Sequence, residues 1–157
     1  MAIYVKELFL LLKKNLNSLI PEKDVFHSDD LKVLNIYKDN YNKLTKDIDN
    51  QEINSYVNFI IDQLFSANKY FNDQEPWKKK DNIKRLNTII YVSLELIRKI
   101  TILLYPIIPE SSLKVLNIFN ISENKINLHS IVDNDYLNSK SKINKINILF
   151  NKIEKND

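Results

Sequence analysis

The sequence predicts an all-α protein, a five-helix bundle followed by a C-terminal extended arm that packs back on it. Apolar residues recur at three- and four-residue spacing through most of the first 120 residues, which is the period of amphipathic helices. The four prolines fall at the boundaries of these stretches, where helices end or begin. A length of 157 residues, 44% of them hydrophobic and 27% charged, suits one soluble globular domain. We therefore assign residues 1–120 to the bundle and residues 121–157 to a loop and arm of the same domain.

The first helix is expected over residues 2–18, and it ends before Pro21. Its buried face carries apolar residues at helical spacing, namely Val5, Leu8, Phe9, Leu12 and Leu16. Leu10 and Leu11 widen this face. We therefore expect the helix either to lie at the centre of the bundle or to meet a partner with its outer side.

The second helix is expected to begin at Ser28, a residue that commonly caps helix N-termini. Asp29 and Asp30 then occupy the first turn, where carboxylates suit the positive end of the helix dipole. The apolar residues keep alternating three- and four-residue spacing as far as Ile48, and the polar residues 49–51 form a turn.

Two further helices are expected on either side of Pro76. The third covers residues 53–70, and the polar stretch that leads to Pro76 ends it. The fourth covers residues 81–104 and stops before Pro106. Its apolar residues face inward, and four charged residues are assigned to solvent: Lys84, Arg85, Glu95 and Arg98.

The fifth helix is short and begins at Pro109, a residue favoured in the first helical turn. Leu113, Leu116 and Phe119 form its buried stripe. Residues 121–140 read as a loop, and the apolar residues of 143–153 alternate as in an extended arm lying on the bundle.

Composition excludes several classes of site. Cysteine is absent, so the chain has no disulfide, thiolate metal site or thiol nucleophile. Glycine is also absent, which excludes glycine-rich phosphate loops and nucleophile elbows. His27 and His129 lie too far apart to form a local ligand motif, so we expect no metal site. Neighbouring carboxylates such as Asp29 and Asp30 have no partner that would shift a pKa, and we expect no catalytic residue.

Charge and hydropathy bear on location and partners. The apolar run of residues 8–12 is far shorter than the roughly 20 residues that a membrane-spanning helix needs, so we expect no membrane association. A chain without cysteine or a signal peptide is expected in the cytoplasm. The net charge of +3 allows an anionic partner without requiring one.

The most informative cluster combines the only tryptophan with three lysines. Trp77 follows a helix-ending proline and precedes Lys78, Lys79 and Lys80. An indole face stacks on an unpaired base with roughly 1–3 kcal/mol, and lysines add a salt-sensitive attraction to phosphate. The alternative is structural, since a Trp in this position also serves as a hydrophobic staple, and a lysine run is commonly a solvated face.

Five segments carry a resemblance to a known family. In chain order they are Ala67-Asn68-Lys69-Tyr70, Asp73-Gln74-Glu75-Pro76-Trp77-Lys78, Arg85-Leu86, Leu94-Glu95-Leu96-Ile97-Arg98 and Leu103-Leu104-Tyr105-Pro106-Ile107-Ile108-Pro109-Glu110. In order and spacing they resemble the C-terminal anticodon-binding domain of methionyl-tRNA synthetase, a class I enzyme. The resemblance is strong over residues 67–110 and weaker on either side.

The resemblance implies roles for six residues. The tryptophan at the position of Trp77 stacks on an anticodon base in that family. Asn68 and Asn72 would contact base edges, and Lys78, Lys79 and Lys80 would engage phosphate. Asn68 has an alternative role as a buried polar residue that pairs between helices.

The sequence departs from the family in two ways. The family commonly carries an Asn and an Arg on the first helix, where this chain has Ile3 and Glu7. The HIGH-like and KMSKS-like motifs of the catalytic domain are absent. We therefore expect a fragment or a separately encoded piece that is inactive alone, with no cofactor of its own, because ATP and methionine would bind the missing catalytic domain.

Two functions follow as expectations. In the first, the chain recognises methionine tRNA for an aminoacylation that a catalytic domain performs in cis or in trans, docked through the first helix. In the second, the chain is a helical protein-interaction module that has lost tRNA binding. The first is the leading expectation, and the second is supported by Ile3 and Glu7, by the modest net charge and by the broad apolar face of the first helix.

Overall fold

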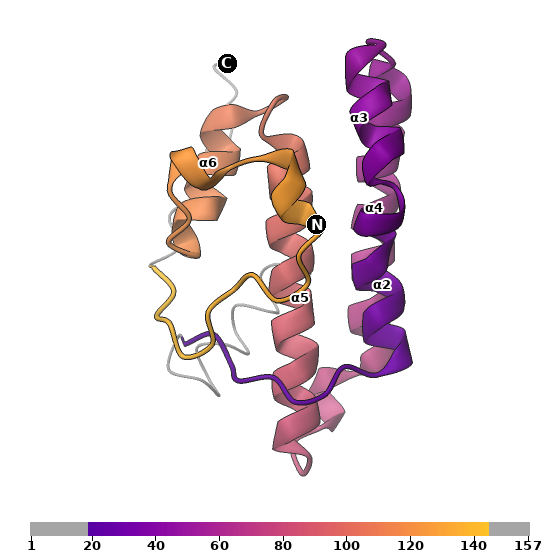
Figure 1. The fold of residues 1–157 in the computed structure, drawn as a ribbon. Coiled ribbons are helices and arrows are strands. Elements are labelled where there is room, and N and C mark those ends of the chain that lie inside the picture. The colour runs from indigo at the N-terminus through magenta and orange to yellow at the C-terminus, as the bar shows by residue number, and fades with distance from the viewer. Residues whose placement is uncertain (1–18, 145–157) are drawn as a thin grey trace, which may run out of the picture.

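The computed structural model describes residues 19–144 of the chain (Figure 1). These residues form five α-helices and three short 3₁₀ helices. The α-helices are α2 (Ser28–Asp39), α3 (Tyr41–Asp49), α4 (Ile53–Gln74), α5 (Ile83–Leu104) and α6 (Pro109–Ile118), and the short 3₁₀ helices are η1 (Pro76–Lys78), η2 (Glu123–Lys125) and η3 (Leu128–Ile131). Within these residues the only β-type pairing is an isolated bridge between Leu19 and Lys142. The all-α fold class is confirmed.

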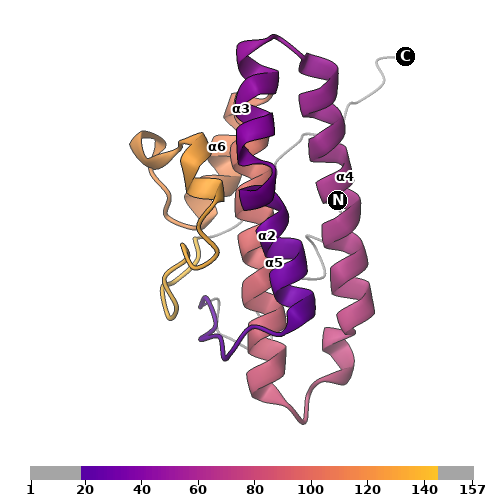
Figure 2. The ribbon, with the colours of Figure 1, turned by 45° about the vertical axis from the view of Figure 1, so that its right-hand side comes forward.

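The helices predicted within the described part of the chain are all found. The second is divided at Asn40 into α2 and α3, which run almost in line (Figure 2). The Asn40 side-chain amide donates to the Ile36 carbonyl at 2.8 Å, a local bond of the kind that competes with helix continuation. The predicted first helix, with Ile3 and Glu7, lies outside the described residues, as does all of the predicted arm beyond residue 144.

Two helix ends differ from the prediction. The N-cap of α2 is His27 rather than Ser28, because the His27 backbone N–H donates to the carboxylate of Asp30 at 2.8 Å. At its other end, α4 continues four residues beyond residue 70. It ends where Glu75 adopts a left-handed backbone (φ 45°) before Pro76, which starts η1.

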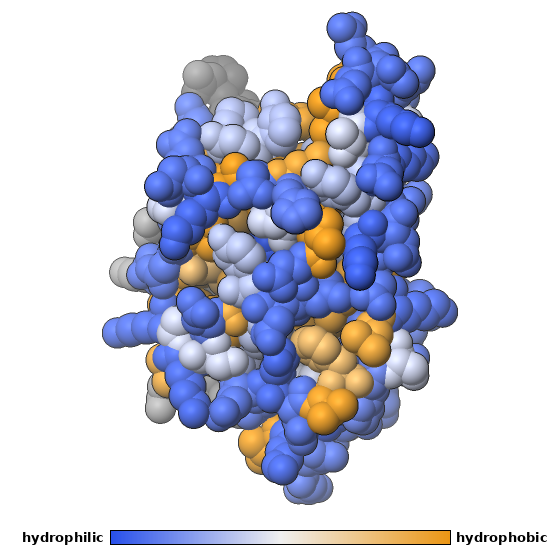
Figure 3. Space-filling view, in the orientation of Figure 1, coloured by the Kyte–Doolittle hydropathy of each residue, from blue (hydrophilic) through white to orange (hydrophobic). Residues whose placement is uncertain are grey.

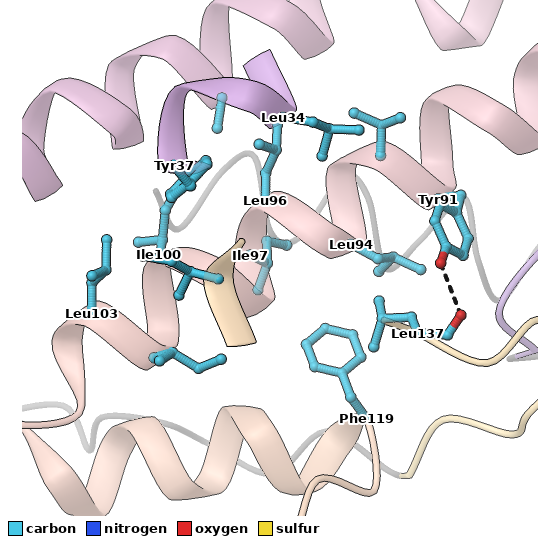
Figure 4. Packing of buried hydrophobic residues seen from close by; sticks show 14 of the residues in the cluster. Leu34, Tyr37, Tyr91, Leu94, Leu96, Ile97, Ile100, Leu103, Phe119 and Leu137 are labelled. Carbon is cyan, nitrogen blue, oxygen red and sulfur yellow. Dashed lines mark hydrogen bonds between the residues drawn. The ribbon is translucent and has the colours of Figure 1, made fainter. Parts of the chain in front are cut away.

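Helix α5 lies at the centre of the described structure. Helices α2, α3 and α4 lie on one side of it, and α6 with the chain beyond it lies on the other (Figures 1 and 2). Every residue from Thr88 to Leu103 is buried. Figure 4 shows α2 packing toward one side of α5 and residues near 119 and 137 toward the other. The outer face in Figure 3 is mostly hydrophilic, with a few hydrophobic groups over the segment that leads into α2.

Burial of α5 overturns the solvent positions assigned to Glu95 and Arg98. Both side chains are fully buried and form an ion pair, with Arg98 Nε donating to Glu95 at 2.7 Å. The guanidinium also donates to the carbonyls of Ser130 and Asp133 at 3.1 Å, and Glu95 accepts the Leu137 backbone N–H at 2.7 Å. A charged residue can be buried when its polar atoms are paired in this way. The pair thus attaches residues 130–137, from the end of η3 onward, to α5.

Lys99 is buried beside this pair and fastens the same segment. Its ammonium donates to the Ile131 carbonyl at 2.5 Å and to Asn134 Oδ1 at 2.8 Å. Burial, reinforced by the positive charge of Arg98, lowers the pKa of Lys99 from 10.5 to about 7.

No helix within residues 19–144 is long and apolar enough to cross a membrane.

We expect the free energy of unfolding to rise between pH 7 and pH 9. The pKa of Lys99 is lower in the folded state, so the unfolded chain binds more protons over this interval and folding gains roughly 2 kcal/mol. Lys99→Met removes the titrating group and should flatten this rise. Urea denaturation of both proteins at the two pH values measures the difference. Equal pH dependence in the two proteins would show that Lys99 is charged in the folded state.

Candidate functional site

The residues singled out from the sequence lie around one end of the bundle. The end of α4, the whole of η1 and the turn into α5 meet there, at the lower end in Figures 1 and 2. The first turn of α2 lies at the same end. Two stretches that lie far apart in the sequence, the first turn of α2 and the connection from α4 to α5, are therefore brought together.

The indole of Trp77 is both anchored and accessible. Its ring meets that of Phe71 edge-on, with centroids 6.1 Å apart and planes at 64°. Phe71 is buried, and so is Pro76, the residue before Trp77. By contrast, 42% of Trp77 remains exposed. The residue contacts the core as a staple would, yet it retains surface on which another flat ring can stack.

Asn68 and Asn72 lie one turn apart on α4, so they share a face of the helix. Asn72 is exposed and Asn68 is half-buried. Neither side-chain amide makes a hydrogen bond with another residue in the range 19–144. Asn72 is five residues before Trp77, and Asn68 is set one turn further into the bundle.

The three lysines differ in how far their charges are compensated. Lys78 Nζ lies 2.6 Å from the carboxylate of Glu75, although both side chains are largely exposed. Lys79 is half-buried and Lys80 is exposed, and neither forms an ion pair with any described residue. The charge available for an anion therefore comes chiefly from Lys79 and Lys80.

Sequence reasoning missed an ion pair between Asp30 and Arg85. Arg85 was assigned to solvent and Asp30 to a helix dipole, but Asp30 is fully buried and the Arg85 side chain is only 10% exposed. Arg85 donates twice to the carboxylate, at 2.6 and 2.9 Å, and Tyr70 donates a third hydrogen bond at 2.5 Å. Arg85 Nη2 also donates to the side-chain oxygen of Gln74 at 2.6 Å. The pair joins α2, α4 and α5 at the end that carries Trp77.

The environment of Asp30 corrects the expectation that no carboxylate has a shifted pKa. Burial alone raises the pKa of Asp30, but hydrogen bonds from Arg85, Tyr70 and the His27 backbone outweigh it. The resulting pKa lies below the ordinary value of 3.8. One feature of the sequence could have indicated these buried ion pairs: the chain has only two arginines among many lysines. Both arginines bind buried carboxylates through the planar guanidinium group, which lysine lacks.

The fold has counterparts among solved structures. The apo form of Mycobacterium tuberculosis methionyl-tRNA synthetase matches with a TM-score of 0.85 at 23% identity, covering 97% of this chain and 31% of that one. The same enzyme with methionyl-adenylate matches with a TM-score of 0.85 at 22% identity, covering 95% and 30%. This chain therefore has the fold of an α-helical region found in methionyl-tRNA synthetases.

Sequence comparison then establishes the family. Residues 20–157 match the family model of the anticodon binding domain of methionyl tRNA ligase, and the chain belongs to that family. The methionine–tRNA ligase of Cytophaga hutchinsonii is 28% identical over 152 residues, which are 96% of this chain and 22% of that protein. The enzyme of Borreliella afzelii is 36% identical over 118 residues, 73% of this chain and 15% of that protein. The resemblance inferred from the sequence is confirmed, and the chain spans about a fifth of the length of such relatives.

We expect Asp30→Asn to destabilise the protein by about 3–5 kcal/mol, because it leaves the Arg85 charge buried without a counter-charge. Asp29→Asn, at an exposed neighbouring position, should change stability by less than about 0.5 kcal/mol. Urea denaturation at pH 7 measures both values. Two variants of equal stability would show that the Arg85 charge does not depend on Asp30 for its compensation.

The same pair should contribute to acid sensitivity. The pKa of Asp30 is lower in the folded state, so its stabilisation is complete above the unfolded pKa near 3.9 and is lost as the pH falls through the folded value. Stability of the wild type should therefore fall more steeply below about pH 5 than stability of Asp30→Asn. Thermal unfolding between pH 6 and pH 3 compares the two slopes.

Proposed function

We propose that this chain binds the anticodon loop of methionine tRNA and so supplies tRNA recognition to a methionine–tRNA ligase. The observation that carries the proposal is the indole of Trp77, held against the core and 42% exposed beside uncompensated lysines. Membership of the anticodon-binding domain family supports the same role. Formation of methionyl-tRNA is then catalysed by a separate catalytic domain, in cis or in trans, which binds ATP and methionine in the cytoplasm.

Stacking on Trp77 supplies most of the local binding energy in this proposal. An unpaired base in a loop exposes its ring faces, and stacking on an aromatic side chain contributes roughly 1–3 kcal/mol. The contact with Phe71 and the buried Pro76 fix the indole before RNA arrives. Less side-chain freedom is therefore lost when a base stacks on it.

Polar groups around Trp77 complete the proposed contact. The amides of Asn72 and Asn68 each offer a donor and an acceptor to base edges, with Asn72 the more accessible. Lys79 and Lys80 attract the phosphate backbone. Lys78 contributes less, because its ammonium already lies 2.6 Å from Glu75.

Replacement of Trp77 tests the proposal directly. We expect Trp77→Ala to weaken binding of methionine tRNA about 5- to 150-fold, the range that corresponds to loss of one stacked base. Trp77→Phe, which keeps a smaller aromatic face, should retain an intermediate affinity. Filter-binding titrations against methionine tRNA and an unrelated tRNA measure these values, and thermal unfolding confirms that both variants fold.

Three outcomes of this titration are informative. Preference for methionine tRNA that is lost in Trp77→Ala supports the proposal. Equal binding of both tRNAs, unchanged in Trp77→Ala, would leave only a sequence-independent attraction to phosphate and would contradict it. Absence of binding at low salt would leave the protein-interaction module as the function.

The salt dependence of binding distinguishes the lysines. We expect the double variant Lys79→Gln, Lys80→Gln to reduce the slope of log affinity against log salt by about 1.4, or about 0.7 for each single-strand phosphate contact. Lys78→Gln should change the slope by less, since Glu75 already compensates that charge. Titrations between 50 and 200 mM salt measure the slopes. A larger effect from Lys78→Gln than from the double variant would reverse the assignment.

A further inference from the structure

Gln74, the last residue of α4, has its side-chain amide fixed in one orientation. Arg85 Nη2 lies 2.6 Å from one terminal atom of this amide. An arginine side chain has hydrogen-bond donors and no acceptor, so the atom that it contacts must be the amide oxygen. The amide nitrogen, with its two N–H donors, is therefore turned away from Arg85.

The orientation is secured because Arg85 is itself held in place. Both of its terminal nitrogens donate to the carboxylate of Asp30, at 2.6 and 2.9 Å, and that carboxylate is fully buried. A flipped amide would bring its nitrogen against the guanidinium nitrogen and would lose a charge-assisted hydrogen bond. Asp30 and Arg85 thus act as positioning residues for Gln74.

The amide nitrogen has little to bind within the described part of the chain. Its one contact there is Asp29 Oδ2 at 3.4 Å, a long hydrogen bond between exposed groups. Gln74 as a whole is half-buried, and the hydrogen bond from its amide nitrogen to Asp29 lies in exposed surroundings. A donor with a fixed direction and a weak partner is suited to an incoming acceptor.

The nearness of Gln74 to Trp77 indicates that this acceptor is an atom on a base edge of the anticodon loop. Only Glu75 and Pro76 separate the two residues, so their Cα atoms lie within about 11 Å of each other. A loop with one base stacked on Trp77 brings a neighbouring base edge to the same end of the bundle. Every base edge carries both donors and acceptors, but at different places: the pairing-edge ring nitrogen of adenine and cytosine is an acceptor, whereas that of guanine and uracil carries a hydrogen. A donor with a fixed direction therefore distinguishes bases by where their acceptor lies, and replacement of an anticodon base by guanine moves that acceptor.

We propose that Gln74 is a specificity-determining residue, which donates its amide N–H to an acceptor on an anticodon base in the orientation set by Arg85. The inference rests on the proposed function, because it requires the anticodon loop to bind at Trp77. It assigns to Gln74 a reading of base identity that stacking on Trp77 does not provide.

Gln74→Glu tests the donor while keeping the positioning contact. The carboxylate still accepts from Arg85, so the fold is retained, but it presents an acceptor where the amide nitrogen was. Gln51→Glu, at the turn between α3 and α4, adds the same charge at the other end of the bundle and is the matched control. The RNA ligands are the anticodon hairpin of methionine tRNA and three hairpins in which each anticodon base in turn is guanine.

The measured quantity is discrimination, the ratio of affinities for the natural and the guanine-substituted hairpin at each position. We expect the wild type and Gln51→Glu to discriminate alike, and Gln74→Glu to lose roughly tenfold at one position, the size expected for one hydrogen bond and its unmet acceptor. Arg85→Lys keeps the positive charge but loses the paired geometry, so it should reduce discrimination at the same position although Gln74 is intact.

Two results would overturn the inference in distinguishable ways. Unchanged discrimination at all three positions in Gln74→Glu, in a protein whose binding still depends on Trp77, would refute the role of Gln74 and leave the proposed function standing. Failure of the wild type to bind any hairpin would refute the proposed function and this inference together. Loss of discrimination in Gln74→Glu at a single position supports the inference.

Discussion

Burial of α5 on all sides is the constraint on which the described structure depends. Each charged group on its buried part must find a partner, since an unpaired charge in the interior is costly. Glu95, Arg98 and Lys99 are paired with the backbone and side chains of residues 130–137, a segment that begins in η3 and contains no α-helix. Near its start, Arg85 finds Asp30. The same requirement thus attaches the C-terminal segment along one side of the helix and organises the Trp77 end of the bundle.

The ion pair between Asp30 and Arg85 restricts the relative positions of the helices at that end more than it increases the free energy of unfolding. A buried ion pair is often no more stabilising than apolar residues of similar volume, but breaking it is strongly unfavourable. Asp30, Arg85 and Gln74 come from three helices, so few relative positions of those helices satisfy all of their hydrogen bonds. We infer that the pair maintains the relation between the ends of α2, α4 and α5, and with it the setting of Trp77.

Much of the fold could be predicted from the sequence, whereas the polar interior could not. Helical periodicity located α2 to α6 because it depends on apolar spacing, which burial preserves. It misassigned Arg85, Glu95 and Arg98, because a charged residue within a helical pattern has the same appearance whether water or a buried carboxylate faces it. Trp77, on which the proposed function rests, was selected through a local motif. Gln74, the residue of the further inference, could not be selected in that way, since the proposed role depends on Arg85, eleven positions further along the chain.

The turns of this chain are made without glycine, and Glu75 illustrates the effect. Glu75 takes a left-handed backbone that costs an L-residue with a Cβ atom about 1–2 kcal/mol, and Gln51, Asn120 and Lys140 also have positive φ. A side chain at such a position also restricts the unfolded backbone, so less conformational entropy is lost on folding than with glycine. The connection that carries Trp77 is consequently restricted in its backbone before any ligand binds, and under the proposed function an RNA loop would have to adapt its own shape to this preformed surface.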